Sequence, residues 1–386
     1  MTGGFLPYGR QDIDDDDVAA VVETLRSDFL TTGPTLARFE AAVAERVGAS
    51  WAVAVSSGTA ALHASCHAAR LGPGDEVVVP AISFVASANC ARYVGAEPVF
   101  ADVDPNSGLI SSVDVERQLS DTTSAIVAVH LTGAPAATVE LAAMVAGREV
   151  TIIEDAAHAI GATSHGGAVG GCVSSAMAVF SFHPVKTVTS AEGGVVTGND
   201  PELARRLRSF RNHGIVKEPT EEPWYYEQRE LGFNYRLSDV HAALGLSQLA
   251  KLDGFLDKRR ALAGRYRELL ESVDHVTPVT TSEVMNHSGH HLFSVLIEFE
   301  QLGADRAQVM NLLRQNGIGS QVHYIPIPAQ PYYRERGWRV EDFPGALSYY
   351  QRTLSLPLYP TMTSADVDRV VSALVDAIAG SAGRRS

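Results

Sequence analysis

Two apolar runs that each end in reactive side chains decide the fold: TIIEDAAH at residues 151–158 and AMAVFSFHPVK at residues 176–186. Their apolar, partly β-branched or aromatic composition predicts buried strands at 151–154 and 176–182. Comparable runs predict further strands, at 51–55, 76–79, 98–103, 125–130 and 194–197. Helical patterns at 59–70 and 84–93 lie between the first of these strands. This alternation predicts an α/β fold with a doubly wound, mostly parallel sheet.

Helical segments are predicted on both sides of this region. Before it, acidic residues at 14–17 precede an apolar stripe formed by Val18, Val21, Val22 and Leu25, and a second amphipathic helix follows Gly33-Pro34. After it, residues 239–270 have a helical pattern. A smaller α+β region follows, with strands predicted at 292–299 and near 321–324 and helices near 304–315 and 365–378. We therefore expect a large domain at residues 1–250 and a small C-terminal domain at 251–386.

Composition excludes several classes of partner. The 386 residues carry a formal net charge of −14, which disfavours binding to nucleic acid and to anionic membranes. The first residues lack the pattern of a signal peptide, and no apolar run approaches the roughly 18 residues that span a bilayer. The cysteines, Cys66, Cys90 and Cys172, match no metal-binding spacing and no disulfide framework. These features predict a cytoplasmic protein without a structural metal.

The segment after the strand at 51–55 is a candidate phosphate site. Ser57, Gly58 and Thr59 join that strand to a helix, where free backbone N–H groups and the helix dipole favour an anion. Gly58 permits close approach of a ligand to the backbone. The alternative is that Ser57 only caps the helix.

Two acidic residues end the strand at 151–154. Because ligands of open α/β sheets bind at the carboxyl ends of the strands, a carboxylate of the pair Glu154-Asp155 is a candidate partner for a protonated pyridine nitrogen, which it would keep charged. The alternative is a carboxylate that caps the next turn. His158 follows closely and is either part of the site or a structural imidazole.

Lys186 lies four residues beyond the strand at 176–182, in a stretch without other charges through Thr189. Loss of hydration in such surroundings lowers the pKa of a lysine and makes its amine a good partner for a Schiff base. A lysine taken alone is more often an ordinary surface residue. The combination and the order of the three segments, with a phosphate turn, then an acid and then a lysine, favour the functional interpretation.

In this order and in its motifs the chain resembles the DegT/DnrJ/StrS sugar aminotransferases, over essentially its whole length. The motifs are Ser57-Gly58-Thr59-Ala60-Ala61-Leu62, Glu154-Asp155-Ala156-Ala157-His158, Ser181-Phe182-His183-Pro184-Val185-Lys186, Glu192-Gly193-Gly194 and Gly232-Phe233-Asn234-Tyr235-Arg236-Leu237-Ser238-Asp239. The resemblance implies an aspartate aminotransferase-like fold (fold-type I) and the cofactor pyridoxal 5′-phosphate (PLP), with pyridoxamine phosphate as its aminated form. Residues 6–34, 183–186 and 323–334 look most like the UDP-4-keto-6-deoxy-N-acetylhexosamine C4 aminotransferases of the pseudaminic-acid pathway.

The resemblance also implies roles for individual residues. Lys186 would bind the cofactor covalently, Asp155 would pair with its ring nitrogen, and Phe84 would stack on the ring beside His158. Ser57, Gly58, Thr59 and Ser181 would hold the phosphate. Asn234 would reach the phosphate bound by a neighbouring subunit, which implies a homodimer with shared sites.

The resemblance leaves the substrates open. His213, His323 and Tyr324 are candidates for positioning a nucleotide-linked sugar, and L-glutamate is the expected amino donor. Arg211 and Arg236 are candidates for binding the donor's carboxylate, and both have structural alternatives. Pro328-Ala329 departs from the family pattern near the expected sugar site. A dTDP-linked keto sugar or a cyclitol ketone is therefore an alternative acceptor, and a non-catalytic PLP-binding regulatory protein is a minor alternative.

Overall fold

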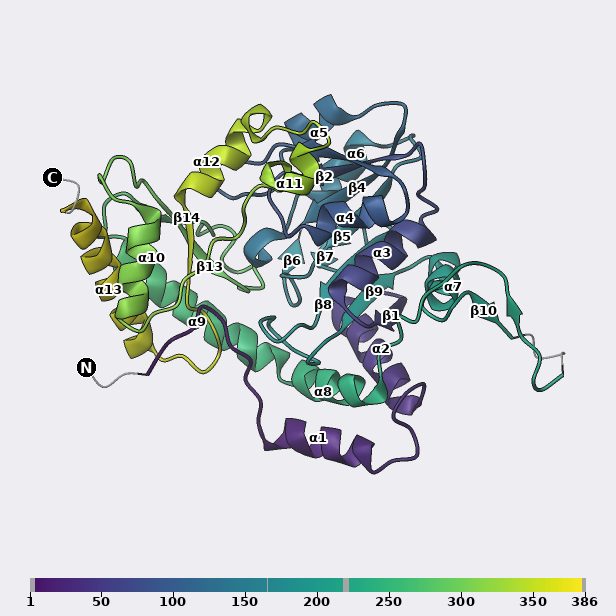
Figure 1. Cartoon of the computed structure of the whole chain (residues 1–386). Helices are drawn as coiled ribbons and strands as arrows, with labels where there is room; N and C mark the ends of the chain where they lie inside the picture. Colours follow the sequence, from purple (N-terminus) through teal and green to yellow (C-terminus); the bar gives the residue numbers. More distant parts are fainter. Residues whose placement is uncertain (1–3, 165, 218–221, 384–386) are drawn as a thin grey trace.

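The computed structural model describes residues 4–164, 166–217 and 222–383. Its centre is a seven-stranded sheet with the strand order β1-β9-β8-β5-β4-β2-β3 (Figure 1). The strands are β1 Trp51–Val55, β2 Glu76–Pro80, β3 Glu97–Ala101, β4 Thr123–Val129, β5 Thr151–Asp155, β8 Met177–Ser181 and β9 Gly194–Gly198. Five of them, from β8 to β3, pair in parallel, whereas β9 is antiparallel to both β8 and β1. The predicted α/β fold with a mostly parallel sheet is confirmed.

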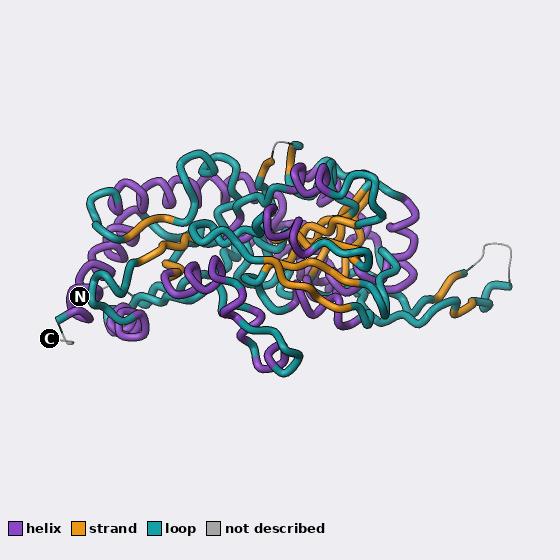
Figure 2. The backbone as a smooth tube through the Cα atoms, turned by 90° about the horizontal axis from the view of Figure 1, so that it is seen from above, coloured by secondary structure: helices purple, strands orange, loops and turns teal. Residues whose placement is uncertain are grey.

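Helices cover both faces of this sheet. One face packs against α3 (Gly58–Ala68), α4 (Ala86–Tyr93) and α7 (Pro201–Phe210). The other face packs against α5 (Ser112–Gln118) and α6 (Thr138–Met144) beside β2 to β4, and against α2 (Pro34–Val47) and α8 (Asp239–Ala250) beside β1, β9 and β8. Figure 2 shows the strands enclosed between the helices. Because both faces are covered, side chains that must reach a ligand are left at the strand ends.

The helix α1 (Asp15–Leu25) contacts the rest of the chain through polar groups. Asp17 is fully buried and accepts hydrogen bonds from the side chains of Ser247 and Gln248 on α8, and it pairs with Lys251 directly after that helix. The helix lies where the sequence predicts it. Its apolar stripe is only partly covered, however, since Val18 and Leu25 are 53% and 55% exposed in the single chain.

The C-terminal region has its own sheet and its own core. The sheet has the order β12-β13-β14, formed by Val276–Pro278, Phe293–Ile297 and Thr353–Leu356. It packs with α9 (Leu252–Leu270), α10 (Arg306–Gln315) and α13 (Ser364–Ala382). Only Lys251 separates α8 from α9, so these two helices run almost continuously across the predicted domain boundary. The boundary near residue 250 stays a prediction.

The strand predicted near residues 321–324 is wrong. Gln321 makes a single bridge to Ser355, and the chain then leaves the sheet. The reason is that His323 hydrogen-bonds the Ser355 hydroxyl through its side chain, at 2.8 Å, instead of continuing the backbone ladder. This departure carries residues 322–325 to the wall of the cavity described below.

Short elements complete the chain. They are β6 (Thr163–Ser164), β7 (Gly167–Ala168), α11 (Pro331–Arg334), α12 (Pro344–Arg352) and three 3-10 turns at Leu131–Gly133, Ile327–Ala329 and Val340–Asp342. A further pair, β10 (Ile215–Val216) and β11 (Glu227–Gln228), forms the base of an arm that extends away from the body in both views (Figures 1 and 2). Within the ranges given above, we find no helix long and apolar enough to cross a membrane.

Asp239 holds the start of α2 from a distance of about two hundred residues in sequence. Its buried carboxylate accepts hydrogen bonds from the backbone N–H groups of Gly33, Thr35 and Leu36, at 2.8, 2.9 and 3.1 Å. These are N–H groups that a helix cannot satisfy internally. The last residue of the Gly232–Asp239 motif therefore has a structural role.

Replacing Asp239 with alanine should lower the free energy of unfolding by about 2–3 kcal/mol, because three backbone donors, two of them buried, lose a charged acceptor. Urea denaturation followed by circular dichroism would measure this. Asp257→Ala is the matched control, since Asp257 is exposed on α9 and its side chain, among the residues that the structure describes, pairs with Arg260 one turn away. It should change stability by less than about 0.5 kcal/mol. Equal losses in the two variants would contradict the capping role.

Candidate active site

A cavity of about 770 Å³ opens at the carboxyl ends of β4, β5 and β8. Its floor includes Val129, Asp155 and Ser181, the last residues of these strands. The start of α3, the segment before α4 and residues 321–325 form its walls. Ligands of open α/β sheets bind at this edge, where strand ends, helix N-termini and loops converge.

The phosphate turn lies at one wall of the cavity. Ser57 is the N-cap of α3, and its hydroxyl oxygen accepts a hydrogen bond from Ala60 N at 3.1 Å. The capping alternative is therefore true of Ser57, yet its own O–H remains able to donate to an anion. A Cβ on Gly58 would lie 3.0 Å from Cβ of Ser181, so Ser181 would have to shift by a few tenths of an ångström to accommodate it. Glycine thus lets the N-terminus of α3 approach the end of β8, and both segments line the cavity.

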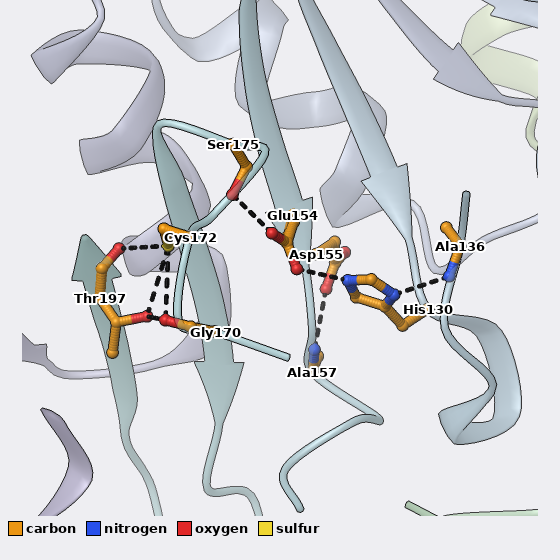
Figure 3. A network of polar contacts seen from close by, with 9 residues as sticks. All are labelled: His130, Ala136, Glu154, Asp155, Ala157, Gly170, Cys172, Ser175 and Thr197. Carbon is orange, nitrogen blue, oxygen red and sulfur yellow. Dashed lines mark hydrogen bonds and ion pairs between the residues drawn. The ribbon is translucent and has the colours of Figure 1, made fainter. Parts of the chain in front are cut away.

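The two acids at the end of β5, Glu154 and Asp155, have different surroundings. Adjacent residues of a strand point to opposite faces of the sheet. Asp155 lines the cavity and accepts hydrogen bonds from the Ser87 hydroxyl at 2.6 Å and from Ala157 N at 3.2 Å. Glu154 points to the opposite side (Figure 3). Only Asp155 of the pair is thus placed to meet a ligand in the cavity.

Glu154 belongs to a buried polar network behind the cavity (Figure 3). His130 Nδ1 accepts a hydrogen bond from Ala136 N, so its Nε2 carries the proton and donates to Glu154 at 2.8 Å. Ser175 donates to the other carboxylate oxygen at 2.5 Å. Burial alone would raise the pKa of Glu154, but these hydrogen bonds outweigh burial, and the pKa is lowered. The network holds β4, β5 and the segment before β8 together.

Lys186 lies on the cavity wall, four residues after the loop leaves β8 at Phe182. Burial lowers the pKa of its amine from the ordinary 10.5 to about 8, and the negative charge of Asp155 partly opposes this shift. Roughly a tenth of Lys186 is therefore uncharged at pH 7, far more than of an ordinary lysine. An uncharged amine that shares a cavity with a carboxylate can attack a carbonyl carbon and can accept or return a proton.

Four imidazoles and two phenols line the cavity with Lys186, from His158, His183, His291, His323, Tyr8 and Tyr324. His158 Nε2 lies 3.2 Å from the hydroxyl of Tyr324, and its ring centroid lies 4.4 Å from that of His291. Burial, followed by the charge of Lys186, lowers the pKa of His158 well below its usual range and that of His323 to about 3. These imidazoles are neutral at physiological pH. Nδ1 of His158 has no hydrogen-bond partner among the described residues.

Most of the predicted site residues line the cavity together. They are Ser57, Gly58, Thr59, Phe84, Asp155, His158, Ser181, Lys186, His323 and Tyr324. Phe84 is 55% exposed, so it is not a core residue of the single chain. Asn234 and His213 do not line the cavity of the same chain, and both are exposed. Their predicted roles stay predictions.

Several lining residues were missed from the sequence. They include Tyr8, Ser83, His291, Gln321 and Gln330. No local pattern marks Tyr8, His291, Gln321 or Gln330, because they come from segments that only the tertiary fold brings to the strand ends. Ser83 differs, since it follows the carboxyl end of β2 and directly precedes the predicted Phe84. Arg211, a candidate for binding the donor, instead contacts Glu40 and the carbonyl of Ala54, and it is held away from the cavity lining.

Comparison with known proteins gives consistent matches over the whole chain. The model of the DegT/DnrJ/EryC1/StrS aminotransferase family matches residues 11–375. The spore coat polysaccharide biosynthesis protein SpsC of Bacillus subtilis (strain 168) is 37% identical over 384 residues, which cover 97% of this chain and 98% of that protein.

Solved structures agree with these matches. The putative sugar aminotransferase Spr1654 of Streptococcus pneumoniae, solved in PLP and PMP forms, superposes with TM-scores of 0.90 and 0.91 at 27% identity, over 97% of this chain and 99% of that chain. PseC of Helicobacter pylori, an aminotransferase involved in the biosynthesis of pseudoaminic acid, superposes with a TM-score of 0.91 at 29% identity. The PseC match covers 97% of this chain and 100% of that chain.

The pKa of Lys186 can be tested in the protein without cofactor. Reductive methylation requires an uncharged amine, so its rate at Lys186 should rise with a midpoint near pH 8 in the folded protein and near 10.5 in urea. Mass spectrometry of the peptide that contains Lys186 would measure the methylation rate, and so the midpoint, in each state. In Asp155→Asn the midpoint should fall below 8, because a charge that raises the pKa has been removed. The same midpoint in folded and unfolded protein would show that burial does not control this amine.

Proposed function

Because this chain belongs to the DegT/DnrJ/EryC1/StrS aminotransferase family and is a PLP-dependent sugar aminotransferase, we propose that it transfers the amino group of L-glutamate to C4 of a UDP-linked 4-keto-6-deoxy-N-acetylhexosamine. The observation that carries this proposal is the meeting of Lys186, Asp155 and the N-terminus of α3 in one cavity at the strand ends. A reactive amine, a buried acid and a phosphate site are the three contacts that PLP requires.

The residues of the cavity fit PLP. The close approach of Gly58 to Ser181 brings the backbone N–H groups at the start of α3 and the hydroxyls of Ser57 and Ser181 to one end of the cavity, where they can hold a phosphate, and a side chain at 58 would crowd Ser181. Asp155 is placed to contact a ring nitrogen, and the exposed ring of Phe84 provides an aromatic face for a planar group. When bound, PLP supplies an electron-withdrawing ring that stabilises negative charge on the carbon next to the amine.

The chain's own residues then move protons and orient the reactants. In the first half of the reaction, Lys186 Nζ would take a proton from the carbon that bears the donor's amine and deliver it to the cofactor, which would keep the amino group. Water would supply the carbonyl oxygen with which the carbon skeleton of glutamate leaves as 2-oxoglutarate. In the second half, Lys186 delivers a proton to C4 of the sugar as the ketone becomes an amine. The face of the sugar that Lys186 meets sets the configuration at C4.

The part of the cavity wall formed by residues 321–325 suits a sugar substrate. His323 and Tyr324 reach the cavity because the chain leaves the small sheet after Gln321, and they present imidazole and phenol groups for sugar hydroxyls or carbonyls. The unusual Pro328-Ala329 pair does not line the cavity, whereas Gln330 does. Because Pro328-Ala329 lies outside the cavity lining, this departure from the family pattern is weak evidence against the proposed sugar. The similarity to PseC of H. pylori supports a sugar of this type.

The experiment is a comparison of acceptors with the purified PLP enzyme and L-glutamate. The UDP-linked 4-keto-6-deoxy-N-acetylhexosamine should show a kcat/KM at least about tenfold above those of dTDP-4-keto-6-deoxyglucose and a cyclitol ketone, equivalent to roughly 1.4 kcal/mol of transition-state binding. Mass spectrometry and NMR should identify a C4 amine. Lys186→Ala should give no product, and borohydride reduction should leave no PLP covalently attached to the protein.

Two other outcomes have defined meanings. A tenfold preference for the dTDP sugar or the cyclitol would overturn the proposed acceptor and leave the aminotransferase assignment intact. Covalent PLP binding without amination of any ketone would point to a regulatory PLP-binding protein.

We also propose that the active unit is a homodimer with shared sites. Apolar side chains lie exposed along the N-terminal segment and on the arm; they include Ile13, Val18, Leu25, Phe29, Leu30, Trp224, Tyr226, Leu231 and Phe233. Burial of such a surface against a second copy is favourable. Among the described residues that line the cavity there is no arginine, although a nucleotide diphosphate needs cations. A neighbouring subunit is a source for them.

Subunit exchange would test the shared site. Lys186→Ala and Asn234→Ala proteins, each inactive, are mixed 1:1 and allowed to reassociate. About a quarter of the wild-type activity should return, because half of the dimers are hybrids and one site in each hybrid is intact. Mixing Lys186→Ala with Asp155→Asn is the matched control and should restore none, since both side chains belong to the same chain's cavity. Recovery in the control, or a fully active monomer, would contradict the arrangement.

A further inference from the structure

We propose that two serine hydroxyls, Ser83 and Ser87, form a directed hydrogen-bond chain that positions Asp155 and keeps the proton on the ring nitrogen of the cofactor. The inference rests on the proposed function, because it takes Asp155 as the partner of that nitrogen. It assigns positioning roles to two residues that do not carry the chemistry themselves.

The hydrogen bonds of this hydroxyl chain are short, and its members are buried. Ser83 Oγ lies 2.7 Å from Ser87 Oγ, and Ser87 Oγ lies 2.6 Å from Oδ2 of Asp155. Ser83 is 3% exposed and Ser87 is fully buried. Hydrogen bonds at such distances with an ionised acceptor are about twice as strong as those between neutral groups.

The direction of the chain follows from the proton count. A carboxylate that faces a protonated nitrogen has no hydrogen of its own, so the one hydrogen of Ser87 Oγ must point to Asp155. Ser83 must then donate to Ser87. Oδ1 of Asp155 accepts from Ala157 N. Both oxygens are thus anchored from the protein side, and the plane of the carboxylate is set.

This anchoring has an electronic consequence. Donation of a hydrogen bond to a carboxylate favours its ionised form. Without Ser87, the carboxylate would hold a shared proton more strongly, and the proton would shift from the ring nitrogen toward Asp155. A ring without that proton withdraws electrons less well, so removal of the proton from the donor's carbon would slow.

The same segment carries the aromatic face of the site. Phe84 directly follows Ser83, and Ser87 N donates to the carbonyl of Phe84 at 3.1 Å in the first turn of α4. The hydroxyl chain therefore joins the start of α4 to the end of β5. It thereby links Asp155, which would contact the nitrogen of the cofactor ring, to Phe84, which would contact the face of that ring.

The primary test uses PLP that carries ¹⁵N at the ring position, bound to each variant and observed by solid-state NMR. In Ser87→Ala the nitrogen signal should move from the protonated toward the unprotonated range. In the same variant kcat should fall about tenfold, while KM for the amino donor changes less than about twofold. Ser87→Thr, which keeps the hydroxyl, should retain the wild-type signal.

Two further variants separate this role from general packing. Ser83→Ala leaves the Ser87–Asp155 bond intact and should give a smaller loss, about threefold, so it remains informative if Ser87→Ala folds poorly. Ser65→Ala is the matched control, since Ser65 is a fully buried helical serine that donates to the carbonyl of Ala61 and lies outside the cavity. It should leave the nitrogen signal unchanged.

The variant Asp155→Asn separates the role of the hydroxyl chain from the role of Asp155 itself. If Asp155→Asn moves the nitrogen signal and lowers kcat but Ser87→Ala and Ser83→Ala do neither, the hydroxyl chain has no positioning role and the proposed function stands. If Asp155→Asn also changes neither, the assignment of Asp155 falls, and the inference falls with it. An equal shift in Ser65→Ala would reduce the effect to packing and overturn the inference.

Discussion

A carboxylate buried at the end of a central strand is the constraint on which the site depends. Asp155 ends β5, between β4 and β8, where it is 6% exposed and must be compensated by donors. The backbone of the next turn and the hydroxyl of Ser87 supply them on the protein side. The cavity side is left for a cation, and the parallel register of the sheet places Lys186 within its electrostatic reach. Burial of both groups in one cavity sets the reactivity of the amine.

Much of this arrangement can be predicted from sequence. Apolar runs ending in reactive residues predicted the strands of the large sheet, and β1 has the predicted bounds. The same reasoning indicated the phosphate turn, the acid and the lysine, because strand ends of a parallel sheet converge. Burial alone could not decide between Glu154 and Asp155, because both end an apolar run. Successive side chains of β5 point to opposite faces of the sheet, so Glu154 joins the buried network and Asp155 lines the cavity.

Other features depend on contacts that no local pattern records. His291, Tyr8 and Gln330 reach the cavity from segments distant in sequence. The apolar stripe of α1 predicted a helix correctly, but the buried contact is made by Asp17, whose partners lie more than two hundred residues away. The expected strand at 321–324 failed because a side-chain hydrogen bond replaced a backbone ladder. In each case tertiary structure decided between locally acceptable alternatives.

The close approach at the phosphate end also limits how this enzyme can be redesigned. A Cβ at Gly58 would crowd Ser181, and one at Gly194 would lie 2.2 Å from the carbonyl oxygen of Ser57. Three segments from different parts of the chain thus share one small volume, and enlargement of any one displaces the others. Elsewhere on the cavity lining, Ile325 and Gln330 are not among the near neighbours of any described glycine, whereas a Cβ at Gly319 would lie 3.1 Å from Tyr8 N. Libraries aimed at new acceptors should therefore vary Ile325 and Gln330 and leave the three-segment junction untouched.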